Sequence, residues 1–135
     1  MDRDAAVVLV VEDNESSATT LELALSNVQG LKVVLAATAQ DALHLLGEAM
    51  PAVRAIVTDL NMPRMSGFEL IEHIRRDLGN AVLPIIVVSG DTDPESPVRA
   101  RAAGADAYFS KPFSPARLKQ KLEQLLHENQ ARHGQ

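Results

Sequence analysis

Short apolar runs alternate along the chain with longer stretches in which apolar residues recur every three or four positions. The short runs are nearly continuous in Val, Leu, Ile or Ala, a pattern typical of strands that are buried on both faces of a parallel sheet. We therefore predict strands at residues 5–11, 32–36, 54–58, 83–88 and 107–109.

The longer stretches have the helical spacing of apolar residues and end at glycine or before proline, where helices commonly stop. A strand followed by a helix, repeated five times, predicts a (βα)5 fold of the α/β class, in which a parallel sheet carries helices on both faces. This periodicity leaves the strand order open. The helical stripes are Leu21/Leu25/Val28, Ala39/Ala42/Leu43/Leu46, Ile71/Ile74/Leu78, residues 98–103, and Leu118/Leu122/Leu125.

Composition restricts the kind of protein. The chain has 135 residues, of which 46% are hydrophobic, enough for one domain with a core of its own. We predict that residues 1–129 form this domain and that residues 130–135 are a disordered tail. The net charge of −5 and the scattered basic residues argue against direct nucleic-acid binding. No apolar run reaches the ~18 residues of a membrane span, and cysteine is absent, so we expect a cytoplasmic protein.

Polar residues follow four of the five predicted strands. Glu12 and Asp13 follow the first, Asp59 the third, Ser89 the fourth and Lys111 the fifth. The carboxyl ends of parallel strands share one edge, and open α/β sheets bind ligands there, where the strand order reverses. In the flavodoxin-like order 2-1-3-4-5, this point lies between the first and third strands, which carry the three acids.

Three neighbouring carboxylates repel one another unless a cation lies between them, and oxygen ligands favour a hard ion such as Mg2+. A metal ion, a lysine and a hydroxyl together can hold a phosphoryl group. Asp59 could then act as the nucleophile and become an aspartyl phosphate.

These motifs together resemble those of receiver domains, the modules that receive the signal in two-component response regulators, including the single-domain chemotaxis type. The resemblance covers residues from about 7 to 126 and implies a flavodoxin-like, doubly wound five-stranded sheet of order 2-1-3-4-5. The matching segments are residues 12–13, Asp-Leu-Asn-Met-Pro-Arg-Met-Ser-Gly at 59–67, Ser-Gly at 89–90 and Lys-Pro-Phe at 111–113.

The resemblance also implies the role of each site residue. Asp59 would accept a phosphoryl group from a sensor histidine kinase or a histidine phosphotransfer protein. Glu12, Asp13, Asp59 and the backbone carbonyl of Asn61 would hold Mg2+, for which Mn2+ could substitute. Ser89 and Lys111 would contact the phosphoryl group.

A conformational switch is implied as well. Tyr108 matches an aromatic position that responds to movement of Ser89, and the peptide bond between Lys111 and Pro112 would be cis. The fourth helix, fifth strand and fifth helix would form the face that docks an unknown downstream protein, and a homodimer through this face is left open. The protein would catalyse its own phosphorylation and slow autodephosphorylation without being a conventional enzyme.

Structural interpretations exist beside the functional ones. The acids at 12 and 13 could cap a helix, Asp59 could belong to a turn, and Tyr108 could be a core residue. Gly67 is interpreted as giving room at the start of the third helix. The histidines, His44, His73, His127 and His133, are interpreted as solvated residues that bind nothing.

Three other functions remain as alternatives. The chain could be a receiver-like interaction module that acts without phosphorylation, or the receiver fragment of a hybrid histidine kinase or longer regulator. A phosphatase of the haloacid-dehalogenase type would need a carboxylic acid two residues after its nucleophile. Asn61 stands at that position and cannot act as a general acid.

Overall fold

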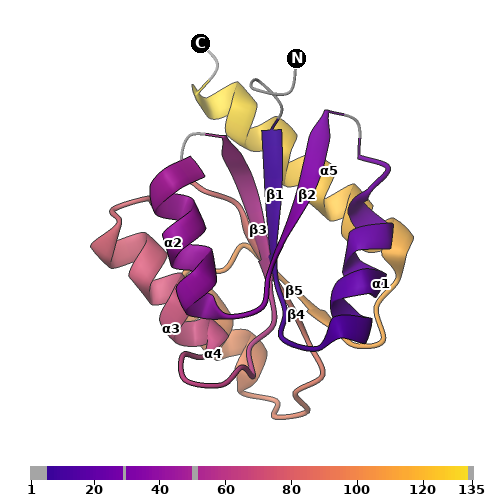
Figure 1. The fold of residues 1–135 in the computed structure, drawn as a ribbon, viewed down its shortest axis with the longest axis vertical. Helices are drawn as coiled ribbons and strands as arrows, with labels where there is room; N and C mark the ends of the chain where they lie inside the picture. Colours follow the sequence, from indigo (N-terminus) through magenta and orange to yellow (C-terminus); the bar gives the residue numbers. More distant parts are fainter. Residues whose placement is uncertain (1–5, 29, 50–51, 134–135) are drawn as a thin grey trace.

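A computed structural model describes residues 6–28, 30–49 and 52–133, and it shows a parallel sheet with helices on both faces (Figure 1). The strand order is β2-β1-β3-β4-β5, which confirms the flavodoxin-like α/β fold. The strands are β1 (Ala6–Val11), β2 (Leu31–Ala36), β3 (Val53–Thr58), β4 (Ile85–Ser89) and β5 (Ala107–Ser110). The helices are α1 (Glu15–Leu25), α2 (Ala39–Ala49), α3 (Gly67–Glu72), α4 (Ser96–Ala103) and α5 (Pro115–His133).

Most residues of the central strands are buried, as the apolar runs predicted. In β1, the four residues from Val8 to Val11 have no exposed surface, and β4 is buried throughout. Parallel pairing of β1 with β3 places Leu9 opposite Ile56 and Val11 opposite Thr58. The acids that follow these two strands are therefore brought to the same edge of the sheet.

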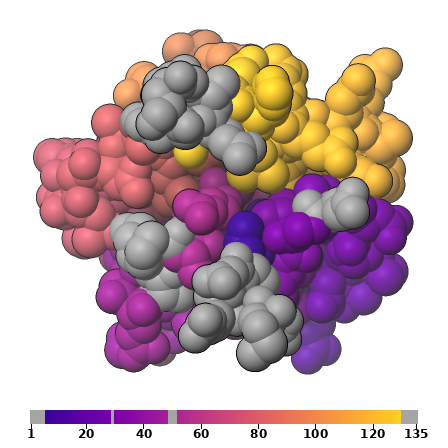
Figure 2. Space-filling view, turned by 90° about the horizontal axis from the view of Figure 1, so that it is seen from above, coloured from indigo at the N-terminus to yellow at the C-terminus, as the bar shows by residue number. Residues whose placement is uncertain are grey.

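The sheet separates two apolar clusters. Leu9 and Ile56 belong to the cluster beneath α2, α3 and α4, whereas Val8 and Leu118 belong to the cluster beneath α1 and α5. The two groups of helices lie on opposite sides of the strands in Figure 1, and Figure 2 shows α2 and α3 on one side of the molecule and α1 and α5 on the other. Successive residues of a strand thus contribute to different clusters, because side chains alternate across a sheet.

The third helix differs from its prediction in its second half. It begins with a capping box in which the Ser66 hydroxyl accepts from the Glu69 amide at 3.2 Å and the Glu69 carboxylate accepts from the Ser66 amide at 2.9 Å. The helix becomes π-helical at His73–Asp77. Leu78, predicted on the apolar stripe, is 42% exposed, so that part of the prediction is wrong. The wider π turn shifts it off the face that Ile74 shares.

Two other boundaries also differ. β4 begins at Ile85 instead of residue 83, because Pro84 has no amide hydrogen to give to a neighbouring strand. The structure continues α5 to His133, so residues 130–133 are helical, and the predicted division into a domain and a tail stays a prediction. No proline or glycine lies between Asn129 and His133, so helix propagation meets no obstacle there. Residues 134 and 135 lie outside the described residues.

Within the described ranges, no helix is both long and apolar enough to cross a membrane.

Arg75 ties the end of the third helix to the end of α4. Its guanidinium donates to the Gly104 carbonyl at 3.0 and 2.7 Å and to the Asn80 carbonyl at 3.1 Å, and pairs with Asp106 at 3.1 Å. Burial lowers the pKa of Arg75, and Asp106 opposes this effect. Gly104 has a φ of 123°, and a Cβ there would meet the Arg75 side chain at 2.7 Å, so only glycine fits.

Candidate active site

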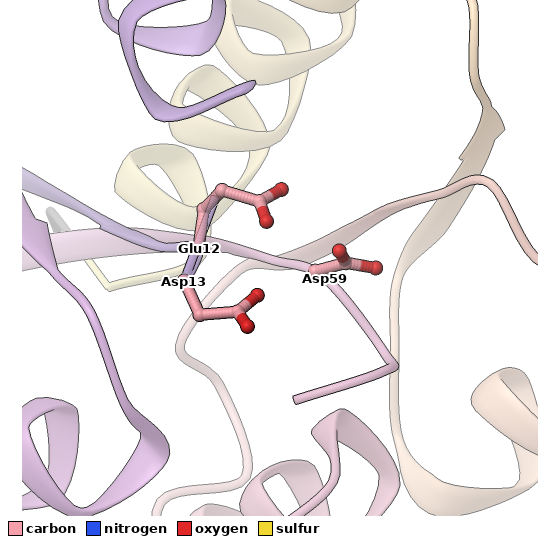
Figure 3. A group of neighbouring side chains, drawn as sticks. All are labelled: Glu12, Asp13 and Asp59. Atoms are coloured by element: carbon pink, nitrogen blue, oxygen red, sulfur yellow. The ribbon is translucent and has the colours of Figure 1, made fainter. Parts of the chain in front are cut away.

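The three acids predicted from the sequence lie together. Glu12 and Asp13 directly follow β1, Asp59 directly follows β3, and the Asp59 amide donates to the Val11 carbonyl at 3.0 Å. One carboxylate oxygen from each acid lies within 4.8 Å of the others. Figure 3 shows the three carboxylates around one space between the ends of the two strands. The edge of the sheet therefore gathers these acids as expected.

The acids differ in their access to water. Glu12 and Asp59 are buried, with 4% and 8% of their surface exposed, whereas Asp13 is exposed. Burial, with a contribution from the nearby Asp59 charge, raises the pKa of Glu12, although Lys111 opposes the increase. The unfavourable charging of Glu12 is what a cation between the carboxylates would relieve. All three groups offer oxygen, so the cluster fits a hard divalent cation better than Zn2+.

Lys111 places a positive charge beside two of the acids. Its Nζ lies 2.8 Å from Glu12 Oε1 and 3.4 Å from Asp59 Oδ2, and it also reaches the Ser17 hydroxyl at 3.4 Å. Burial alone would lower the pKa of Lys111, but the carboxylates of Glu12 and Asp59 outweigh it and raise the pKa. The ammonium group therefore stays charged beside Asp59.

Backbone contacts fix the direction of Lys111. Its amide donates to the Ser89 carbonyl at 2.8 Å, which holds the end of β5 against the end of β4. The peptide bond between Lys111 and Pro112 is cis, as the family resemblance implied. A cavity of about 210 Å³ opens beside this turn, and its lining includes Ser17 and Phe113.

Asp59 is held tightly through its own backbone. The Asp59 carbonyl accepts from the buried Thr58 hydroxyl at 2.8 Å, and its Oδ1 accepts from the Leu60 amide at 2.6 Å. Gly67 donates its amide to the Leu60 carbonyl at 2.8 Å, and a Cβ at Gly67 would overlap the Asp59 carbonyl oxygen. This close approach confirms that Gly67 is needed for space at the start of α3.

Ser89 and Tyr108 lie on neighbouring strands. Ser89 is the buried last residue of β4, and its Oγ accepts from the Asp91 amide at 3.0 Å. The Tyr108 ring is partly buried and packs against the cluster beneath α4. Burial raises the pKa of Tyr108, Ser89 opposes the rise, and the phenol makes no hydrogen bond of good geometry within the described residues.

The remaining predicted residues lie at or outside this site. Asn61 is exposed two residues after Asp59, and its backbone carbonyl as a metal ligand stays a prediction. His44 and His73 each pair with an acid four residues on, at 3.0 and 2.9 Å, and His127 is exposed. The side chain of His133 lies outside the described residues.

Sequence reasoning missed two groups that support the site. Thr58 is a fully buried hydroxyl at the end of β3, and its only signal is that it is a polar residue directly after the apolar residues 55–57. Ser17 contacts Lys111 from the first turn of α1, and nothing in its local sequence distinguishes it from a solvated serine.

Comparison with known proteins agrees with this geometry. The profile of the response regulator receiver domain matches residues 8–123. Chemotaxis protein CheY1 of Helicobacter pylori is 32% identical over 90% of this chain and 98% of its own length. A response regulator receiver protein of Pseudomonas putida superposes with a TM-score of 0.78 at 35% identity, over 88% of this chain and 96% of that structure.

Longer relatives share only this part. The transcriptional regulatory protein KdpE of Mycobacterium tuberculosis is 34% identical over 93% of this chain. The match covers 53% of KdpE, so the chain spans about half the length of that relative.

Proposed function

The chain belongs to the response regulator receiver family, and we propose that it accepts a phosphoryl group on Asp59 from a sensor histidine kinase or a histidine phosphotransfer protein. The observation that carries this proposal is the meeting of Glu12, Asp13 and Asp59 with the Lys111 ammonium at one edge of the sheet. A buried nucleophile, a cation site and a fixed positive charge are the groups that phosphoryl transfer requires.

In the transfer step, a carboxylate oxygen of Asp59 attacks the phosphorus of the donor's phosphohistidine. A P–O bond forms while the P–N bond breaks, and the electron pair of that bond stays on the imidazole nitrogen. Lys111 pairs with one phosphoryl oxygen, and the Ser89 hydroxyl donates to another. The ammonium group neutralises phosphoryl charge that the acidic cluster would otherwise repel, and the hydroxyl stabilises the phosphoryl oxygen by its hydrogen bond.

The metal requirement follows from the acids. Glu12, Asp13, Asp59 and the backbone carbonyl of Asn61 would hold Mg2+, or Mn2+ in its place. When bound, this ion supplies positive charge to the carboxylates and to the phosphoryl oxygens. Burial, with a contribution from the Asp59 charge, raises the pKa of Glu12, and a cation bound among the carboxylates would favour its ionised form, which supports this assignment.

The reaction ends by autodephosphorylation and not by turnover of an outside substrate. Water attacks the phosphorus of the aspartyl phosphate, the P–O bond to Asp59 breaks, and inorganic phosphate leaves. Asn61 cannot donate a proton as a carboxylic acid does, which supports slow hydrolysis over conventional phosphatase activity. In the cytoplasm, the lifetime of the phosphorylated form would set the length of the signal.

The output follows from Ser89 and Tyr108. Movement of Ser89 towards the phosphoryl group would change the surroundings of Tyr108, whose phenol oxygen is buried and has no hydrogen-bond partner among the described residues. The face formed by α4, β5 and α5 would then dock a downstream protein or a second copy of the chain.

Intact mass spectrometry after incubation with phosphoramidate, a small phosphodonor, tests the proposal. With Mg2+, the wild-type protein should gain the mass of one phosphoryl group, whereas Asp59→Asn should gain none. EDTA should prevent the gain in the wild type. Equal incorporation in Asp59→Asn, or none in the wild type with Mg2+, would contradict the assignment.

A further inference from the structure

A string of hydrogen bonds runs through the loop between β4 and α4. The Ser89 Oγ accepts from the Asp91 amide at 3.0 Å, and Asp91 Oδ1 accepts from the Asp93 amide at 2.8 Å. Asp93 Oδ1 then accepts from the Glu95 amide at 2.9 Å. In each bond, a side-chain oxygen accepts from the backbone amide two residues further along the chain. The side chains of Ser89, Asp91 and Asp93 therefore link the loop from β4 to α4.

The last member of this string also holds the first turn of α4. The Asp93 carbonyl accepts from the Ser96 amide at 3.0 Å, in addition to the bond from its carboxylate to Glu95. Glu95, the residue at the helix N-cap, makes no capping bond with its own side chain. Ser96 is 2% exposed, so this turn is seated in the protein. The orientation of the start of α4 therefore depends on Asp93.

Asp91 is connected to the same helix by its charge. The Asp93 amide, followed by the Ser96 hydroxyl, lowers the pKa of Asp91. The Asn61 side chain and the Arg99 charge contribute in the same direction. These groups favour the ionised form of Asp91, whose Oδ1 accepts from the Asp93 amide.

The two ends of α4 are held differently. At its C-terminal end, Arg75 donates to the Gly104 carbonyl at 3.0 and 2.7 Å, which fastens the helix to the third helix. At its N-terminal end, the contacts just described are made by a loop whose residues are mostly exposed. A force applied through the loop would therefore turn α4 about its Gly104 end.

We propose that Asp91 and Asp93 are positioning residues that transmit the movement of Ser89 to the N-terminal end of α4. The proposal rests on the proposed function, because the movement begins when Ser89 donates to a phosphoryl group on Asp59. A serine hydroxyl has one donor and two acceptor positions, so Ser89 can make that bond and still accept from the Asp91 amide. The string then moves as a unit, without breaking its first bond.

Beryllofluoride with Mg2+, a mimic of the aspartyl phosphate, provides the probe, and amide shifts in heteronuclear NMR provide the readout. In the wild type, we expect shifts at Leu60 and Ser89, next to the site, and along α4. In Asp93→Ala, the shifts near the site should persist while those along α4 are lost or strongly reduced. Without the Asp93 acceptor, the movement of Ser89 is no longer transmitted to the Glu95 amide, so the shifts along α4 should fall towards their values in the protein without beryllofluoride.

Matched variants separate the hydrogen bond from other effects. Asp93→Asn keeps the Oδ1 acceptor but removes the charge, so it should restore the response of α4. Thr92→Ala changes an exposed neighbour that has no part in the string, so it should respond like the wild type. Asp91→Ala and Asp91→Asn repeat the comparison one bond closer to Ser89 and serve if Asp93→Ala does not fold.

The outcomes distinguish this inference from the function beneath it. A full α4 response in both alanine variants, or no rescue by the asparagine variants, overturns the transmission through the string. Absence of shifts at Leu60 and Ser89 in the wild type instead refutes phosphoacceptance, and the inference fails with it. Shifts near the site in all variants, with an α4 response in the wild type and asparagine variants only, support both.

Discussion

Gly67→Ala should damage both the stability and the chemistry of the protein. The amide of Gly67 lies against the backbone of the nucleophile, and a Cβ there would overlap the Asp59 carbonyl oxygen and lie 2.8 Å from the Leu60 Cα. Neither neighbour is the mobile end of a side chain. The methyl group can be accommodated only if the start of α3 or the end of β3 moves.

The size of the effect follows from these rigid neighbours. Overpacking a core typically costs about 1–3 kcal/mol, and the backbone atoms of Asp59 and Leu60 that the methyl group meets favour the upper end of that range. At about 3–4 °C per kcal/mol for a chain of this size, the midpoint of thermal unfolding should fall by roughly 10 °C. A shift of Asp59 by about 1 Å would slow phosphoryl acceptance on the order of 100-fold.

Two measurements and one control test this prediction. Urea denaturation gives the change in the free energy of unfolding, and mass spectrometry after timed exposure to phosphoramidate gives the rate of phosphorylation. Gly47→Ala is the matched control, because Gly47 lies exposed within α2 and a Cβ there meets nothing within 4 Å. This control should be stabilised by about 0.5–1 kcal/mol, since alanine favours a helix over glycine.

The two glycine variants must therefore change stability in opposite directions. If Gly67→Ala unfolded at the wild-type urea concentration and accepted the phosphoryl group at the wild-type rate, the close approach of α3 to Asp59 would have no energetic importance. A loss of stability with an unchanged rate would show that the packing argument holds but that Asp59 is not displaced.

Three further predictions follow from the structure. Arg75→Met should lower the free energy of unfolding by about 1–2 kcal/mol in urea denaturation, because it removes the donor to the Gly104 carbonyl, whereas Asp106 is 40% exposed and still accepts from the Ile85 amide. A change below about 0.5 kcal/mol would show that the guanidinium is dispensable. Lys111→Ala should still gain a phosphoryl group by mass spectrometry but show a weaker NMR response in α4 to beryllofluoride, and a full response would remove Lys111 from the switch. Mg2+ should raise the midpoint of thermal unfolding more at about pH 7 than at about pH 5 in calorimetry. The reason is that burial raises the pKa of Glu12, so the metal-free fold loses stability as the pH rises through that pKa. The same rise in pH ionises the Glu12 carboxylate, which can then bind Mg2+. An equal or larger effect of Mg2+ in acid would contradict this prediction.

The sequence predicted the site well because its residues stand out from their surroundings. Strands buried on both faces leave nothing polar in their interior, so acids such as Asp59 directly after an apolar run are conspicuous. The parallel arrangement then forces the strand ends to a common edge, which is why Glu12, Asp13 and Lys111 could be grouped before any geometry was known. Apolar periodicity alone could not predict the order of the strands, because it is the same for every order. That prediction required the family resemblance and the rule that open α/β sheets bind ligands where the strand order reverses.

Other features depend on contacts that local patterns do not encode. Leu78 continues an α-helical stripe, yet the π turn before it shifts the residue into solvent. Arg75 is an ordinary helix arginine in the sequence, and its role depends on Gly104, which lies 29 residues further along the chain. The bonds from Asp91 and Asp93 to the loop backbone are similar, because alternating acids in a loop are usually only solvated.

The separation of the core into two clusters has an evolutionary consequence. Tyr108 and Phe109 are adjacent in β5, yet one packs beneath α4 and the other beneath α5, with the sheet between them. A substitution in one cluster changes the volume available to its own members and leaves the other cluster unaffected. Descendants of this chain can therefore diversify the α1 and α5 side while keeping the α4 side unchanged, and compensating replacements should arise within each cluster and not between them.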